Sequence, residues 1–69
     1  MNWIDANSSN IERFAYDSLS RVLKVEFKNG GTYDYFDVPD TVFERMCSAP
    51  SKGQFLASDI KGVYRYARS

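Results

Sequence analysis

The 69-residue sequence contains no histidine and only one cysteine. Histidine is the commonest general base and metal ligand in proteins, so its absence removes the usual designs of hydrolases and metal centres. One cysteine cannot form a disulfide framework or a cysteine zinc cluster within the chain. We therefore expect no catalytic residue, no metal site and no cofactor. Cys47 lies on an apolar helical stripe, which predicts a buried, reduced thiol rather than a nucleophile.

The sequence also lacks a long apolar run and a net charge. No stretch approaches the ~20 apolar residues of a membrane-spanning helix, and the N-terminus has no signal-peptide pattern. These absences predict a cytoplasmic protein without a membrane partner. Nine basic residues balance nine acidic ones, which excludes the strongly basic class of nucleic-acid binders. The length predicts one small monomeric domain over residues 1–69, in which residues 1–7 are expected to be poorly ordered.

The first half of the chain carries a strand pattern. Residues 22–28 alternate between apolar and charged side chains, as expected for a strand with one buried and one wet face. Residues 11–16 and 32–36 are rich in the β-branched and aromatic residues that favour strands. Turn-forming residues separate these segments at 17–20 and 29–31. The pattern predicts a three-stranded antiparallel meander.

The second half carries two helical patterns. Pro39 and Asp40 are typical of a helix start, and Pro50 ends that first helix. Residues 51–54 have the Ser-x-x-Gln form of a capping box, which opens a second helix with Gly62 at its end. Alternation after Gly62 predicts a C-terminal strand or tail. Strands followed by helices indicate an α+β fold, with both short helices packed on one face of the sheet.

The loop between the second and third strands decides where Tyr33 and Tyr35 point. A two-residue loop would place both tyrosines on the solvent side and bury Asp34, whereas a three-residue loop, 29–31, places both tyrosines inward against the helices. Burying an unpaired carboxylate costs several kcal/mol, so the three-residue loop is favoured. The same parity argument, applied to the preceding turn, places Phe14 inward.

Several short motifs are spread over residues 8–66. They are Ser8-Ser9-x-Ile11, Tyr16-Asp17, Leu23-x-Val25-x-Phe27, Asn29-Gly30, Tyr33-Asp34-Tyr35, Val38-Pro39, Phe43, Ser51-Lys52-Gly53 and Ile60-Lys61-Gly62. Together they resemble the KTSC domain, which occurs at the C-terminus of some lysyl-tRNA synthetases and as a small bacterial or phage protein. The resemblance implies a domain whose function is not established, with RNA binding suggested by the synthetase context. Two positions depart from the pattern: Ala57 stands where Asn is common, and Lys61 where Arg is common.

Candidate contacts for RNA or another anionic partner lie in the C-terminal part. Residues 51–69 hold four basic and one acidic residue, whereas residues 1–50 hold five and eight, so the two parts carry net charges of +3 and −3. Basic residues interleaved with aromatic ones suit backbone contacts and base stacking. The candidate contact residues are Ser51, Lys52, Gly53, Lys61, Tyr64, Arg65, Tyr66 and Arg68.

Each of these candidates has a purely structural alternative. The arginines of the tail could be solvated on a last strand, and Ser51 could serve only as a helix cap. Tyr33 and Tyr35 are weaker stacking candidates, because inward tyrosines are core residues. The sequence therefore favours a non-catalytic module that binds RNA or another anionic partner. The alternative function is a protein–protein interaction module whose partner is a host protein.

Overall fold

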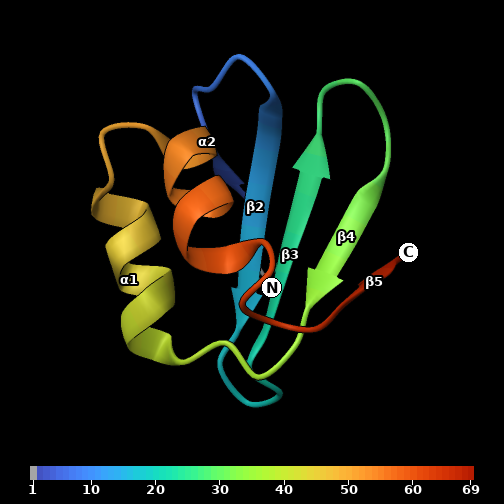
Figure 1. The fold of residues 1–69 in the computed structure, drawn as a ribbon, viewed down its shortest axis with the longest axis vertical. Helices are drawn as coiled ribbons and strands as arrows, with labels where there is room; N and C mark the ends of the chain where they lie inside the picture. The colour runs from blue at the N-terminus through green and yellow to red at the C-terminus, as the bar shows by residue number, and fades with distance from the viewer. Residues whose placement is uncertain (1) are drawn as a thin grey trace.

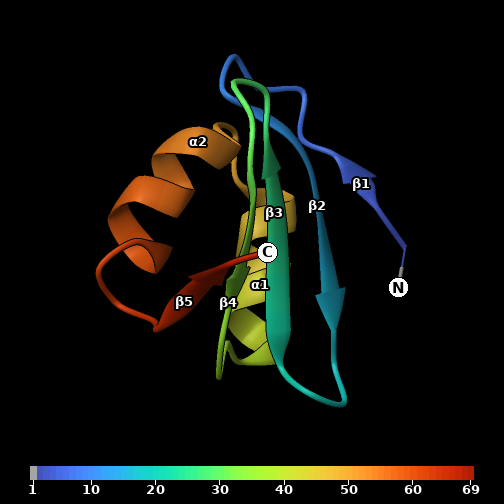
Figure 2. The same cartoon turned by 90° about the vertical axis from the view of Figure 1, so that its right-hand side faces the viewer.

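The computed structural model describes residues 2–69, which form one antiparallel sheet and two helical segments (Figure 1). The strands are β1 (Ile4–Asp5), β2 (Ile11–Asp17), β3 (Val22–Phe27), β4 (Thr32–Tyr35) and β5 (Tyr66–Arg68), and they lie in this order across the sheet. The helices are α1 (Asp40–Ser48) and α2 (Lys52–Phe55), and α2 continues into the π-helical turn η1 (Leu56–Ile60). Both helices lie on one side of the sheet (Figure 2).

The predicted α+β fold with two helices on one face is confirmed, and β2, β3 and β4 form the predicted antiparallel meander, but the sheet has five strands rather than three. An additional strand, β1, pairs with β2, and the C-terminal segment pairs with β4 as β5. The two residues of β1 are too few to show an alternating pattern, whereas β5 is the strand form of the predicted C-terminal strand or tail. β1 falls within residues 1–7, for which poor order stays a prediction, and Met1 lies outside the described residues.

The two predicted hairpins form, each displaced by one residue along the chain. The loop between β3 and β4 has three residues, as predicted, but they are 28–30 rather than 29–31. Gly30 has a φ of +104°, the left-handed conformation that closes such a loop. The β2–β3 loop is similarly displaced, from 17–20 to 18–21. When a loop slides by one residue along the chain, each strand residue faces a partner two positions away from the predicted one. Because side chains alternate between faces with a period of two, every side chain keeps its predicted face.

The inward face of the sheet therefore carries the predicted residues. Phe14, Leu23 and Val25 are fully buried, Tyr35 is 2% exposed, and Tyr33 is half-buried. The other buried hydrophobic residues of the core are Ala6, Ile11, Val38, Met46, Leu56 and Ile60. Burial of apolar surface at roughly 25 cal/mol per Å² makes this cluster the main stabilising contribution.

Helix α1 packs its apolar stripe onto β2. The ring of Phe43 stacks on Tyr16, with 4.7 Å between ring centres, and lies edge-on to Phe14 at 6.1 Å. Met46 is fully buried. The predicted burial of Cys47 is wrong, because this residue lies at the edge of the stripe and is exposed. Partial desolvation nevertheless raises the pKa of the Cys47 thiol.

The second helix begins at the predicted cap and ends in a π-helical turn. The Ser51 hydroxyl oxygen accepts a hydrogen bond from the Gln54 backbone N–H at 3.2 Å. The Lys61 N–H donates to the Leu56 carbonyl at 2.8 Å, a five-residue spacing that widens the last turn. Gly62 follows with a φ of +77°, so it ends the helix as predicted.

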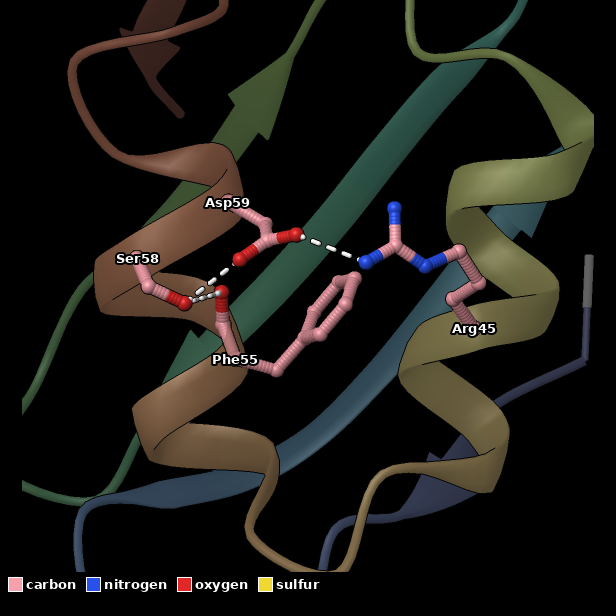
Figure 3. Close-up of polar contacts among 4 residues, drawn as sticks. All are labelled: Arg45, Phe55, Ser58 and Asp59. Carbon is pink, nitrogen blue, oxygen red and sulfur yellow. Dashed lines mark hydrogen bonds and ion pairs between the residues drawn. The ribbon is translucent and has the colours of Figure 1, made fainter.

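A polar cluster joins α1 to the second helix (Figure 3). The guanidinium of Arg45 donates to a carboxylate oxygen of Asp59 at 3.1 Å and lies 5.4 Å from the centre of the Phe55 ring. The Ser58 hydroxyl donates to the other oxygen of Asp59. Exposed ion pairs contribute about 0–1 kcal/mol, so the Arg45–Asp59 pair adds little to the stability of the fold.

Candidate nucleic-acid interface

The helices cover only part of the inward face of the sheet. In Figure 1 they lie in front of and beside β2, while β4 and β5 lie clear of them. The uncovered part forms a pocket of about 640 Å³, which we call the tyrosine pocket. It is lined by Asn10, Phe27, Asn29, Gly30, Tyr33, Tyr35, Lys61, Gly62, Tyr66 and Arg68.

Four aromatic rings form a connected row in the tyrosine pocket. Phe27 meets Tyr33 edge-on at 5.5 Å between ring centres. Tyr66 is tilted against both Tyr33, at 5.6 Å, and Tyr35, at 5.9 Å. Tyr66 is 61% exposed, whereas Tyr35 is 2% exposed, so Tyr66 presents the most accessible ring of the row. Burial raises the pKa of Tyr35, and the neighbouring phenols of Tyr33 and Tyr66 add to this rise.

Two cations lie beside the aromatic row. The Lys61 ammonium is 5.9 Å from the centre of the Phe27 ring, and the Arg68 guanidinium is 5.9 Å from that of Tyr33. These distances are within the range of cation–π attraction. Among the described residues, no aspartate or glutamate lines the tyrosine pocket. The pocket is therefore aromatic and positively charged, although the whole chain is neutral.

Pairing of β5 with β4 brings the C-terminal residues to the pocket. Tyr66 lies opposite Tyr35 and Arg68 opposite Tyr33, so the side chains of both β5 residues share the inward face. Gly31 leaves room for Arg68, because a Cβ atom at this glycine would lie 3.2 Å from the guanidinium. The Gly31 φ of +92° also favours glycine at this position.

The predicted contact residues divide between several places. Lys61, Tyr66 and Arg68 line the tyrosine pocket, together with the weaker candidates Tyr33 and Tyr35. By contrast, Arg65 donates to the Asp37 carboxylate at 3.0 Å and lies over the Phe36 ring. Tyr64 packs against the hydrophobic core. Tyr64 and Arg65 therefore lie outside the tyrosine pocket, at an adjoining pocket that they share with Tyr66.

The Ser51-Lys52-Gly53 motif lies at a second pocket, between α2 and the segment that precedes β2. The Lys52 ammonium donates to the carbonyls of Cys47 and Ala49 at 3.0 and 2.8 Å. Lys52 thus caps the C-terminal end of α1, and Ser51 caps α2. A Cβ atom on Gly53 would lie 2.7 Å from Oδ1 of Asn10. Ser51 and Lys52 thus take part in helix capping, which is the structural alternative to an anion site.

Sequence reasoning missed five residues of the tyrosine pocket: Asn10, Phe27, Asn29, Gly30 and Gly62. The alternation of residues 22–28 places Phe27 on the inward face, but inward position alone does not reveal whether a helix covers it. The sequence marks Asn29, Gly30 and Gly62 as turn and cap residues, which they also are. No motif in the sequence marks any of the five as a pocket residue.

The described residues also limit other kinds of site. No helix over residues 2–69 has both the length and the apolar character required to cross a bilayer. Within the same residues, no three cysteine, aspartate or glutamate side chains lie together in a way that could hold a metal ion.

Comparison with known proteins identifies similar chains. Residues 7–64 match the KTSC domain family. The crystal structure of a KTSC domain protein from Yersinia pestis superposes with a TM-score of 0.95 at 34% sequence identity, and the match covers 99% of this chain and 96% of that one.

Similar sequences occur in two settings. A lysine–tRNA ligase from Trichormus variabilis is 45% identical over 56 residues, which are 81% of this chain. The chain spans only 10% of the length of that ligase. A protein from Tsukamurella paurometabola is 38% identical over 58 residues, and there the match covers 87% of the relative. The same domain thus occurs as a segment of a large enzyme and as most of a small protein.

Proposed function

Because this chain belongs to the KTSC domain family, which supplies a segment of lysine–tRNA ligases, we propose that it is a non-catalytic module that binds RNA through the tyrosine pocket. The ligases act on tRNA, and the matched segment is a tenth of their length. An appended domain of this size suits a role in holding RNA rather than in the reaction itself.

The combination of rings and cations in the tyrosine pocket carries this proposal. Tyr66 offers an exposed ring, and stacking of a base on an aromatic side chain contributes roughly 1–3 kcal/mol. Lys61 and Arg68 line the same pocket, and their charges would attract the phosphates of a strand whose base stacks there. Because no carboxylate among the described residues lines the pocket, a polyanion meets attraction without local repulsion.

We propose a non-catalytic role because the chain lacks the commonest general base and its one thiol is poorly activated. The sequence has no histidine, and the exposed Cys47 thiol has a raised pKa. A raised pKa leaves little thiolate at neutral pH, and the thiolate is the nucleophilic form.

Fluorescence anisotropy with a labelled 12-nucleotide RNA of mixed sequence tests the proposal. We expect binding at 50 mM salt that weakens steeply at 200 mM, because phosphate contacts release counterions. The double variant Lys61→Gln/Arg68→Gln should bind more weakly and should reduce the salt slope by roughly 0.7 for each phosphate that it no longer neutralises. The matched control is Arg13→Gln/Arg45→Gln, which removes the same charge from residues outside both pockets that Tyr66 lines.

Two results would contradict the proposal. Equal loss of affinity in both double variants would show that overall charge, and not the tyrosine pocket, governs binding. No binding at 50 mM salt with excess RNA would end the RNA hypothesis. Recovery of one stoichiometric protein partner by the same chain would then favour the protein–protein interaction alternative.

A further inference from the structure

We infer that the tyrosine pocket takes an unpaired segment of RNA, with one base stacked on Tyr66 and the adjoining phosphates held by Lys61 and Arg68. This inference rests on the proposed function and goes further, because it names the class of RNA and the role of each side chain. Three features of the pocket support it.

The first feature is the accessibility of a single ring. Tyr66 is 61% exposed and is supported by the rings of Tyr33 and Tyr35, tilted by 38° and 40°. Tyr35 is buried and Tyr33 is half-buried, so neither presents a comparable free face. The row therefore offers a stacking position for one base rather than a platform for several.

The second feature is that the aromatic rings lie inside a concave pocket. Asn29 and Gly30 of the β3–β4 hairpin line the pocket, and so do Lys61 and Gly62, which follow the second helix. Its volume of about 640 Å³ lies within the usual range for small-molecule sites, ~300–1,000 Å³. In a duplex the base faces are stacked inside the helix, so a base must leave the helix to reach an aromatic ring in such a pocket.

The third feature is the separation of the two cations along the aromatic row. Lys61 lies over Phe27 and Arg68 lies over Tyr33, so each cation is associated with a different ring. Successive nucleotides of a single strand each carry one phosphate. Phe27 and Tyr33 lie on the same side of Tyr66 in the row, so the two cations can contact successive phosphates of the strand that leads to the base stacked on Tyr66.

The test compares three RNAs that share one 12-nucleotide sequence: the single strand, the blunt duplex, and the duplex with a three-nucleotide 3′ overhang. We expect the single strand and the overhang to bind at least tenfold more tightly than the blunt duplex. Tyr66→Ala should weaken single-strand binding about 5- to 150-fold, the range that the removal of one base stack predicts. Tyr66→Phe, which keeps the ring, should retain most of the affinity.

A matched aromatic control lies on the other face of the sheet. Trp3 is 38% exposed, the Arg13 guanidinium lies over its ring, and it is not among the residues that line the tyrosine pocket. Trp3→Ala should leave the affinity for all three RNAs unchanged.

The outcomes separate the two proposals. Equal affinity for the single strand and the blunt duplex overturns the inference and leaves RNA binding standing. Binding to none of the three RNAs overturns both proposals. Single-strand preference that survives in folded Tyr66→Ala overturns the role of the ring. The comparison of the three RNAs uses the unsubstituted protein, so it decides the preference for unpaired RNA even where a variant fails to fold.

Discussion

The two halves of the inward face of the sheet differ in what covers them. On β2 and β3, Phe14, Leu23 and Val25 lie under the helices and are fully buried. On β4 and β5, Tyr33 is half-buried and Tyr66 is mostly exposed. Both halves carry aromatic residues on this face, so the alternation of aromatic residues alone does not show which half is covered. What differs is whether helix α1 or α2 packs over the strand.

Because of this difference in coverage, aromatic side chains have different roles in the two halves. Aromatic residues in the covered half contribute to stability through burial and ring packing. Aromatic residues in the open half leave apolar ring faces in contact with water, which is typical of binding surfaces. Substitution of aromatic residues should therefore change the free energy of unfolding strongly in the covered half and weakly in the open half. For RNA affinity, the larger change is expected in the open half.

The largest effect is expected from Phe14→Ala in the covered half. Removal of a fully buried ring that packs against Phe43 should lower the free energy of unfolding by about 3–5 kcal/mol. Such a change approaches the whole stability of a small domain. Urea denaturation followed by circular dichroism measures it. A decrease below ~1 kcal/mol would show that the helices do not cover this half.

A smaller but substantial effect is expected from Tyr35→Ala, at the boundary between the halves. Tyr35 is 2% exposed yet lines the tyrosine pocket. Its truncation should lower the free energy of unfolding by about 3 kcal/mol, again measured with urea. A decrease below ~0.5 kcal/mol is typical of surface positions and would move Tyr35 to the open half.

The variant Tyr16→Phe tests the covered half through the pH dependence of the free energy of unfolding. The Tyr16 hydroxyl donates to the Val38 carbonyl and contacts the Asp40 carboxylate, at 2.5 and 2.8 Å. Desolvation, together with Asp40, raises the pKa of Tyr16 to about 12. Below pH 10 the phenol is neutral in both the folded and unfolded chains. Between pH 10 and 12 only the unfolded chain loses this proton, so stability should fall as pH rises.

Thermal unfolding at pH 8, 10 and 11 measures this contribution. At pH 8, Tyr16→Phe should lower the free energy of unfolding by about 1 kcal/mol, because it removes a hydrogen bond. At pH 11 the gap between the two proteins should narrow, since the variant no longer titrates at residue 16. A gap that stays constant from pH 8 to 11 would show that this hydroxyl has the same pKa in the folded and unfolded chains.

The smallest stability effect is expected from Tyr66→Ala in the open half. Because Tyr66 is 61% exposed, its truncation should change the free energy of unfolding by no more than ~0.5 kcal/mol. Urea denaturation under the conditions used for Phe14→Ala gives the direct contrast. A decrease comparable to that of Phe14→Ala would remove the distinction between the halves.

Much of the fold could be predicted from the sequence. Alternation over residues 22–28 and the cost of burying Asp34 place Tyr35 on the correct inward face, although the predicted loop is one residue out of position. The second helix and its Ser51 cap are also predicted correctly. The sequence does not reveal β1, and it leaves β5 open between a strand and a tail. Pairing with the neighbouring strand, rather than local preference, holds such short segments in the sheet.

The candidate site was less predictable than the fold. Charge and aromatic content point to the C-terminal segment, of which Lys61, Tyr66 and Arg68 line the tyrosine pocket. Arg65, adjacent to Tyr66 in the sequence, points instead toward Asp37. Arg65 precedes β5, and its contact with Asp37 keeps its guanidinium away from the tyrosine pocket. Residues adjacent in the sequence therefore do not all reach the same pocket.

The sequence by itself determined the face on which each strand residue lies, because side chains alternate with a period of two and a buried carboxylate is costly. Only the tertiary structure decided which part of that face stays open. Two short helices are too small to cover five strands, and their packing on β2 leaves Tyr33 and Tyr66 uncovered. Coverage depends on contacts between residues far apart in the chain, and no local pattern encodes it.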